Sequence, residues 1–90
     1  MSVVAVIAKV MPASPEADLE KIKQEASKEL EAKGAQNISI EEQPVAFGLK
    51  ALMIKFAWPE EKETEIIEST LSKIENVSSA TIEDYRRAFG

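Results

Sequence analysis

The sequence predicts an α+β fold in which four antiparallel strands form one sheet and two helices pack on one face of it. Patterns typical of strands and helices follow one another in the order β-α-β-β-α-β. The stretch 44–58 is the densest apolar segment of a chain that is 30% charged, and we interpret it as an exposed turn, 44–48, followed by a buried strand. Ninety residues suffice for one modest core, so we expect a single domain over residues 1–90.

The first strand is predicted over residues 2–11, which are rich in β-branched side chains. Its apolar residues fill both alternating sets of positions: Val3, Ala5, Ile7 and Met11, and then Val4, Val6, Ala8 and Val10. Such a strand either lies in the middle of a sheet or faces the core on one side and a partner on the other. Lys9 is its only charge.

The first helix is predicted to begin at Ser14-Pro15-Glu16, because serine caps helix N-termini and proline suits the first helical position. Apolar residues then recur at helical spacing and form one stripe: Leu19, Ile22, Ala26 and Leu30. Gly34 is predicted to end this helix in a left-handed conformation.

The second helix is predicted after Pro59, with Glu60, Glu61, Glu63 and Glu65 crowding its start, where the helix dipole favours acidic groups. Its expected buried stripe is Ile66, Ile67, Thr70, Leu71 and Ile74. A divalent cation bound by the acidic residues at 60–65 is a weaker hypothesis. Asn76 is expected to close the helix.

The remaining two strands are more polar. Ile38 and Ile40 alternate with polar residues, which is typical of a strand with one wet face. A last strand is predicted from residue 77 to about 85, with a short tail over 86–90. Because the segments 2–11 and 49–58 are the most apolar, we expect them at the centre of the sheet and the polar strands at its edges. This arrangement is ferredoxin-like.

Composition excludes several functions. The chain has no cysteine or histidine, which removes disulfides, thiol chemistry and imidazole catalysis. A net charge of −5 argues against binding of nucleic acid through its phosphates. The longest uncharged apolar run is too short for a membrane span. We therefore expect a cytoplasmic protein with no cofactor, no direct contact with nucleic acid or membrane, and a monomeric state when free.

Surface residues remain as functional candidates. Phe47 lies in the turn between Ala46 and Gly48, where it either folds back over the core or anchors a partner, since aromatic residues dominate binding hot spots. Arg86-Arg87 is the only pair of adjacent basic residues in the chain; it is either a solubilising tail or a contact site.

The segment QPVAFGLKALMI, residues 43–54, resembles the signature of the guanine-nucleotide-exchange domain of translation elongation factor 1-beta. The start VVAVIAKVMPASPEADLEKI and the end SKIENVSSATIEDYRRAFG resemble its compact archaeal form. The resemblance implies a ferredoxin-like fold and an exchange factor that promotes GDP release from elongation factor 1-alpha. It also implies that Phe47 contacts the GTPase and that a basic residue near the C-terminus reaches toward the partner's Mg²⁺ site, at Arg87 or its neighbour Arg86. Gly48 and Lys50 of the same motif are further candidates for partner contact.

Two other functions are compatible with the same fold. One is a small-molecule regulatory or assembly module that pairs through exposed edge strands. The other is an enzyme of the acylphosphatase type, which is disfavoured because its phosphate site needs a basic loop that this sequence lacks. Without histidine or cysteine no firm nucleophile–base pair can be assigned, so we expect no enzymatic activity.

Overall fold

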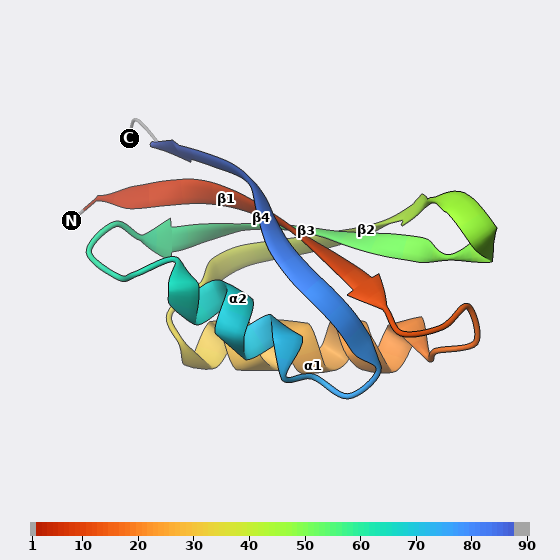
Figure 1. Ribbon diagram of the computed structural model, residues 1–90. Helices are drawn as coiled ribbons and strands as arrows, with labels where there is room; N and C mark the ends of the chain where they lie inside the picture. Colours follow the sequence, from red (N-terminus) through yellow and green to blue (C-terminus); the bar gives the residue numbers. More distant parts are fainter. Residues whose placement is uncertain (1, 88–90) are drawn as a thin grey trace.

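The structure, a computed structural model, describes residues 2–87. Its elements in chain order are β1 (Val3–Pro12), α1 (Leu19–Ala32), β2 (Gln36–Pro44), β3 (Lys50–Pro59), α2 (Glu65–Ser72) and β4 (Val77–Arg87). The strands form one antiparallel sheet in the order β2-β3-β1-β4, and both helices lie on the same face of it (Figure 1). The ferredoxin-like α+β prediction is therefore confirmed, as are the central positions of β1 and β3.

The core lies between the sheet and the helices. Every second residue of β1 and of β3 belongs to the core, which is the pattern expected of strands with one covered face. The core residues from these two strands are Val4, Val6, Ala8, Val10, Leu52, Ile54, Phe56 and Trp58. Within residues 2–87 no helix covers the opposite face of the sheet, so the second apolar set of β1 is not in the core: Val3 is 40% exposed.

Helix α1 begins later than predicted. Its N-terminal cap is Asp18, whose carboxylate accepts the Lys21 backbone N–H at 3.2 Å. The segment Ser14-Pro15-Glu16 instead forms a turn, closed by a hydrogen bond from Ala17 N–H to the Ser14 carbonyl. The Ser14 cap was wrong because aspartate is an equally good cap and lies closer to the apolar stripe.

The end of α1 was predicted correctly. Gly34 has a φ of +108°, and its N–H donates to the Glu31 carbonyl. The next amide, Ala35 N–H, donates to the Leu30 carbonyl. These two bonds form a Schellman motif, which requires the left-handed residue that glycine provides.

Helix α2 is shorter than predicted, and Glu60, Glu61 and Glu63 precede it rather than forming its first turn. The segment after β3 forms a turn that packs against the core. Trp58 Nε1 donates to the Lys62 carbonyl at 3.3 Å, and the Lys62 ammonium lies 5.7 Å from the centre of the indole ring. The same ammonium donates to the carbonyl of Lys33 at the end of α1. With this segment packed as a turn, α2 begins only at Glu65.

Strand β4 is longer than predicted. Arg86 and Arg87 belong to it and pair with Ala5 and Val4 of β1, whereas the sequence suggested a tail from residue 86. The strand continues because the start of β1 offers backbone partners there. The other tail residues, 88–90, lie outside the described residues.

Candidate functional site

The hairpin between β2 and β3 ends in a tip that presents one aromatic side chain. A short 3₁₀ turn, Ala46–Gly48, is closed by hydrogen bonds from Val45 N–H to the Leu49 carbonyl and from Leu49 N–H to the Ala46 carbonyl. Phe47 is 93% exposed, so its side chain projects into solvent and does not fold back over the core. In Figure 1 this tip lies at the right, far from both chain ends.

The backbone of the tip is strained. Phe47 has a φ of +63° and Gly48 a φ of +75°, so two consecutive residues are left-handed. Glycine adopts this conformation readily, but for a bulky side chain it costs roughly 1–2 kcal/mol. An exposed phenylalanine held in such a conformation stabilises nothing in the fold. Strain of this kind concentrates at functional positions.

Charged residues join the base of the hairpin to α1. The Lys23 ammonium donates to the Glu42 carboxylate at 2.7 Å and lies 3.5 Å from Glu20, while Lys50 lies 3.8 Å from the other Glu42 oxygen. The hydrogen bond from Lys23 lowers the pKa of Glu42, and the same bond raises the pKa of Lys23. Glu42 thus connects a helix residue to a strand residue directly below the tip.

The two arginines lie at the other end of the sheet. Successive residues of a strand point to opposite faces, so Arg87 lies on the helix side with its partner Val4, and Arg86 lies on the open side with Ala5. Both are engaged with carboxylates: Arg87 Nε is 3.2 Å from Glu60, and Arg86 Nε is 2.9 Å from Asp84.

The structure does not bring the tip and the arginines together. Lys50 is the first residue of β3, whereas Trp58 near its end pairs with Val4, the neighbour of Arg87. At the usual rise per strand residue, Lys50 and Trp58 are roughly 27 Å apart. Residues predicted to contact one partner therefore lie at opposite ends of a molecule whose longest dimension is 41 Å.

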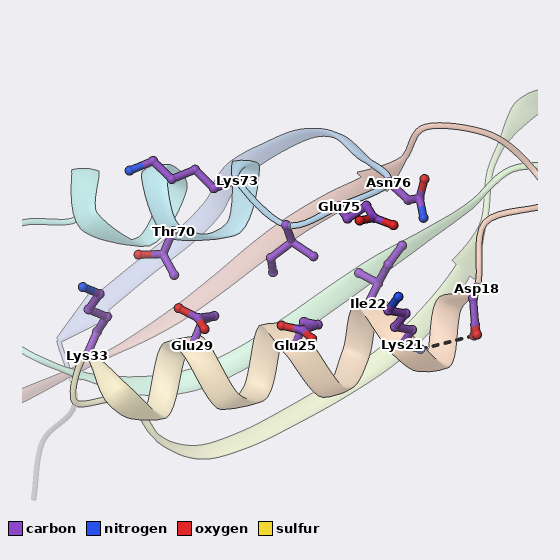
Figure 2. A pocket seen from close by; sticks show the side chains of 11 residues that line it. Asp18, Lys21, Ile22, Glu25, Glu29, Lys33, Thr70, Lys73, Glu75 and Asn76 are labelled. Atoms are coloured by element: carbon purple, nitrogen blue, oxygen red, sulfur yellow. Dashed lines mark hydrogen bonds between the residues drawn. The ribbon is translucent and has the colours of Figure 1, made fainter.

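A groove of about 460 Å³ lies between the two helices, away from both ends. Its floor includes Ile22 and Ile74, and its walls carry charges of both signs, with Glu25 and Glu29 on α1 facing α2 in Figure 2. Within residues 2–87 no buried side-chain polar atom lacks a hydrogen-bond partner. The groove therefore shows no unsatisfied group that calls for a ligand, and none of the predicted site residues lines it.

Neither a cluster of metal-ligating side chains nor a membrane-spanning helix is found in residues 2–87. No group of three or more acidic residues there is placed to hold a metal ion, so the acidic stretch 60–65 supplies no ligand set. No helix in the same residues is long and apolar enough to cross a bilayer.

An exposed aromatic tip and an exposed basic end are features typical of a domain that binds another protein. Comparisons with known proteins agree with this class. The family model described as "EF-1 guanine nucleotide exchange domain" matches residues 5–88. The chain therefore belongs to this family, as the resemblance in residues 43–54 implied, and it has an exchange role in translation elongation.

Curated relatives match over almost their whole length. Elongation factor 1-beta of Methanothermobacter thermautotrophicus is 44% identical over 86 residues, covering 94% of each chain. The protein of the same name from Methanosphaera stadtmanae is 40% identical over 97% of this chain and 98% of its own. The one from Staphylothermus marinus is 38% identical with the same coverage.

Three residues at the two ends were not identified from the sequence. Lys23 and Glu42 belong to separate elements, and only the packing of α1 on the sheet brings them together. Glu60 was interpreted as a helix-start charge, but it lies beside Arg87. No local pattern marks these pairs, because each depends on contacts between distant parts of the chain.

Proposed function

We propose that this protein promotes release of GDP from the GTPase elongation factor 1-alpha, so that GTP can rebind and elongation can continue. The observation that carries the proposal is Phe47, an almost fully exposed aromatic side chain on a strained, left-handed tip. Family membership supports the same conclusion.

Exchange of this kind requires no covalent chemistry. A protein that binds the nucleotide-free GTPase more tightly than the GDP-bound form weakens GDP binding by the same factor, because the two binding equilibria are linked. The described residues present contact surfaces suited to such binding, with Phe47, Gly48 and Lys50 at the tip and Arg86 or Arg87 at the other end.

The two ends have different roles in this proposal. Phe47 supplies an apolar anchor that fills a pocket of the partner. A guanidinium from the other end supplies positive charge near the nucleotide, where it competes with the partner's Mg²⁺. Both arginines are candidates for this role: Arg87 lies on the helix side next to the turn at Glu60, and Arg86 lies on the open side of the sheet.

We also infer that the chain acts as a single domain, is monomeric when free and works in the cytoplasm, where its GTPase partner operates. It contacts neither nucleic acid nor membrane directly in this scheme.

The test is to load elongation factor 1-alpha with fluorescent GDP and to add this protein with excess unlabelled nucleotide. We expect the label to leave faster in proportion to the concentration of added protein until the effect saturates. If the label leaves at its intrinsic rate at every concentration, the proposed function is wrong.

A further inference from the structure

The open face of the sheet carries the apolar residues that the core does not use. On β1 these are Val3, Ala5, Ile7 and Met11, and on β3 they include Met53 and Ala57. The register brings them together, because Ala5 pairs with Ala57 while Lys9 pairs with Met53. The apolar residues of β1 thus occupy both of its faces, although both helices lie on the other face of the sheet (Figure 1).

On this face the lysines lie on the central strands and the carboxylates lie on the edge strands. On the two central strands its only charged side chains are lysines: Lys9 on β1 and Lys55 on β3, which lie diagonally across the strand pair. The carboxylates of the face are on the edge strands, with Glu41 on β2 and Asp84 on β4. Lys55 lies 3.6 Å from Glu41, whereas Lys9 has no ion pair within residues 2–87. A protein of net charge −5 thus has a basic centre on one apolar face.

The two proposed contact ends are too small to hold a partner by themselves. An aromatic side chain buries roughly 150–250 Å², so one phenylalanine and one arginine fall well short of the area of about 800 Å² that one side of a standard interface buries. The open face measures roughly 27 by 14 Å from the strand rise and spacing, or about 400 Å². It lies between the two ends and supplies the area that they lack.

We propose that the open face, centred on Lys9 and Lys55, docks on an acidic surface of the same GTPase, between the contacts made by Phe47 and the C-terminal arginines. This inference rests on the proposed function. A second copy of the chain is the less suitable occupant, because a twofold face-to-face pairing would bring the central lysines of both copies together.

Lysine footprinting tests the proposal on the unmodified protein. The chain is treated with an acetylating reagent, alone and in complex with nucleotide-free elongation factor 1-alpha, and acetylation at each lysine is measured by mass spectrometry. We expect at least fivefold slower acetylation of Lys9 and Lys55 in the complex, with Lys21 and Lys28 on α1 unchanged. If Lys9 and Lys55 are acetylated as fast in the complex as in the free protein, while the same preparation accelerates GDP release in the separate exchange assay, the docking surface is overturned and the exchange function stands. Protection that appears without GTPase and grows with concentration would assign the face to a second copy instead.

Charge reversal provides the second measurement. The variant K9E/K55E should raise the Kd for nucleotide-free GTPase at least tenfold at low salt, and by less at high salt because screening weakens charge pairs. The matched control K21E/K28E changes the net charge equally on α1 and should raise the Kd less than threefold. Equal effects of the two variants, with both folded by thermal melting, would mean that net charge and not this face determines binding.

Discussion

Arg87 Nε lies 3.2 Å from the Glu60 carboxylate, which joins the last described residue of β4 to the turn after β3. Both groups are in contact with solvent, and exposed ion pairs of this kind contribute about 0.2–1 kcal/mol. The pair is therefore weak enough to break when the partner arrives. For Arg87 to act on the nucleotide site of a GTPase, its guanidinium must first break its ion pair with Glu60 and then contact groups of the partner.

The variant Glu60→Gln should increase exchange activity. Removing the carboxylate removes the interaction that Arg87 must give up, so the exchange efficiency should rise by up to about fivefold, which corresponds to the full value of an exposed pair. The measurement is the rate of GDP release over a range of concentrations. Glu61→Gln is the matched control, since it makes the same charge change one residue away. An equal rise in both variants would show that net charge is responsible.

Phe47→Ala should weaken binding to the GTPase and leave the stability of the fold almost unchanged. Because the ring is exposed and supports no other side chain, the free energy of unfolding should change by less than about 0.5 kcal/mol. Binding to the nucleotide-free GTPase should fall by about thirtyfold or more, the loss typical of an aromatic hot spot. Phe47→Tyr, which keeps an aromatic ring, should retain most of the activity. A large loss of stability in Phe47→Ala would contradict the role proposed for the tip.

Gly48→Ala should destabilise the tip through the backbone alone. A Cβ added at Gly48 meets no atom within 4 Å, so the cost comes from its φ of +75° and amounts to about 1–2 kcal/mol. Exchange should weaken as well, since the orientation of Phe47 depends on this turn. Gly48→Asn should lose less, because asparagine tolerates the left-handed conformation best among the other residues. Urea unfolding of both variants checks the order.

The contact between Lys23 and Glu42 should make stability depend on pH. The pKa of Glu42 is lowered in the folded protein, mainly by the hydrogen bond from Lys23, so its contribution is present above the ordinary carboxyl value of about 4.3 and is lost as the pH falls through the lowered pKa. The pKa of Lys23 is raised by the same bond, so its contribution is lost only as the pH rises above about 10.4 and through the raised pKa.

Urea unfolding of the native chain and of Glu42→Gln checks this effect. The native chain should be the more stable near neutral pH, and the difference should vanish in acid once Glu42 is protonated. A difference that stays constant from pH 8 down to pH 2 would show that the contact does not act through this ionisation.

The fold could be predicted from the sequence because its signals are periodic. Strands with two apolar faces identified the centre of the sheet, and the spacing of Ile22, Ala26 and Leu30 identified the covered face of α1. Element ends were less predictable. Ser14 and Asp18 are equally plausible caps, and only the geometry of the loop after β1 decides between them.

Candidate site residues were identified from the sequence where their features are local. Phe47 was a candidate because it lies in a turn next to Gly48, but the sequence left open whether its ring folds back over the core, and the structure shows it 93% exposed. The partners of Arg86 and Arg87 were not predictable, because both arginines were placed in a tail and their strand register depends on β1. Tertiary packing determines which charged residues form ion pairs, and the sequence pattern of one segment does not encode that packing.

The order of the strands has a consequence for how the molecule assembles. Residues at the tip, such as Pro44 and Lys50, are close in sequence, and hairpins of this kind form in roughly 1–10 μs. Val4 and Arg87 pair across almost the entire chain, and closing such a long loop is the slow step in folds rich in distant contacts. The aromatic end can therefore take shape early in folding, whereas the arginine end exists only once the last strand has joined the sheet.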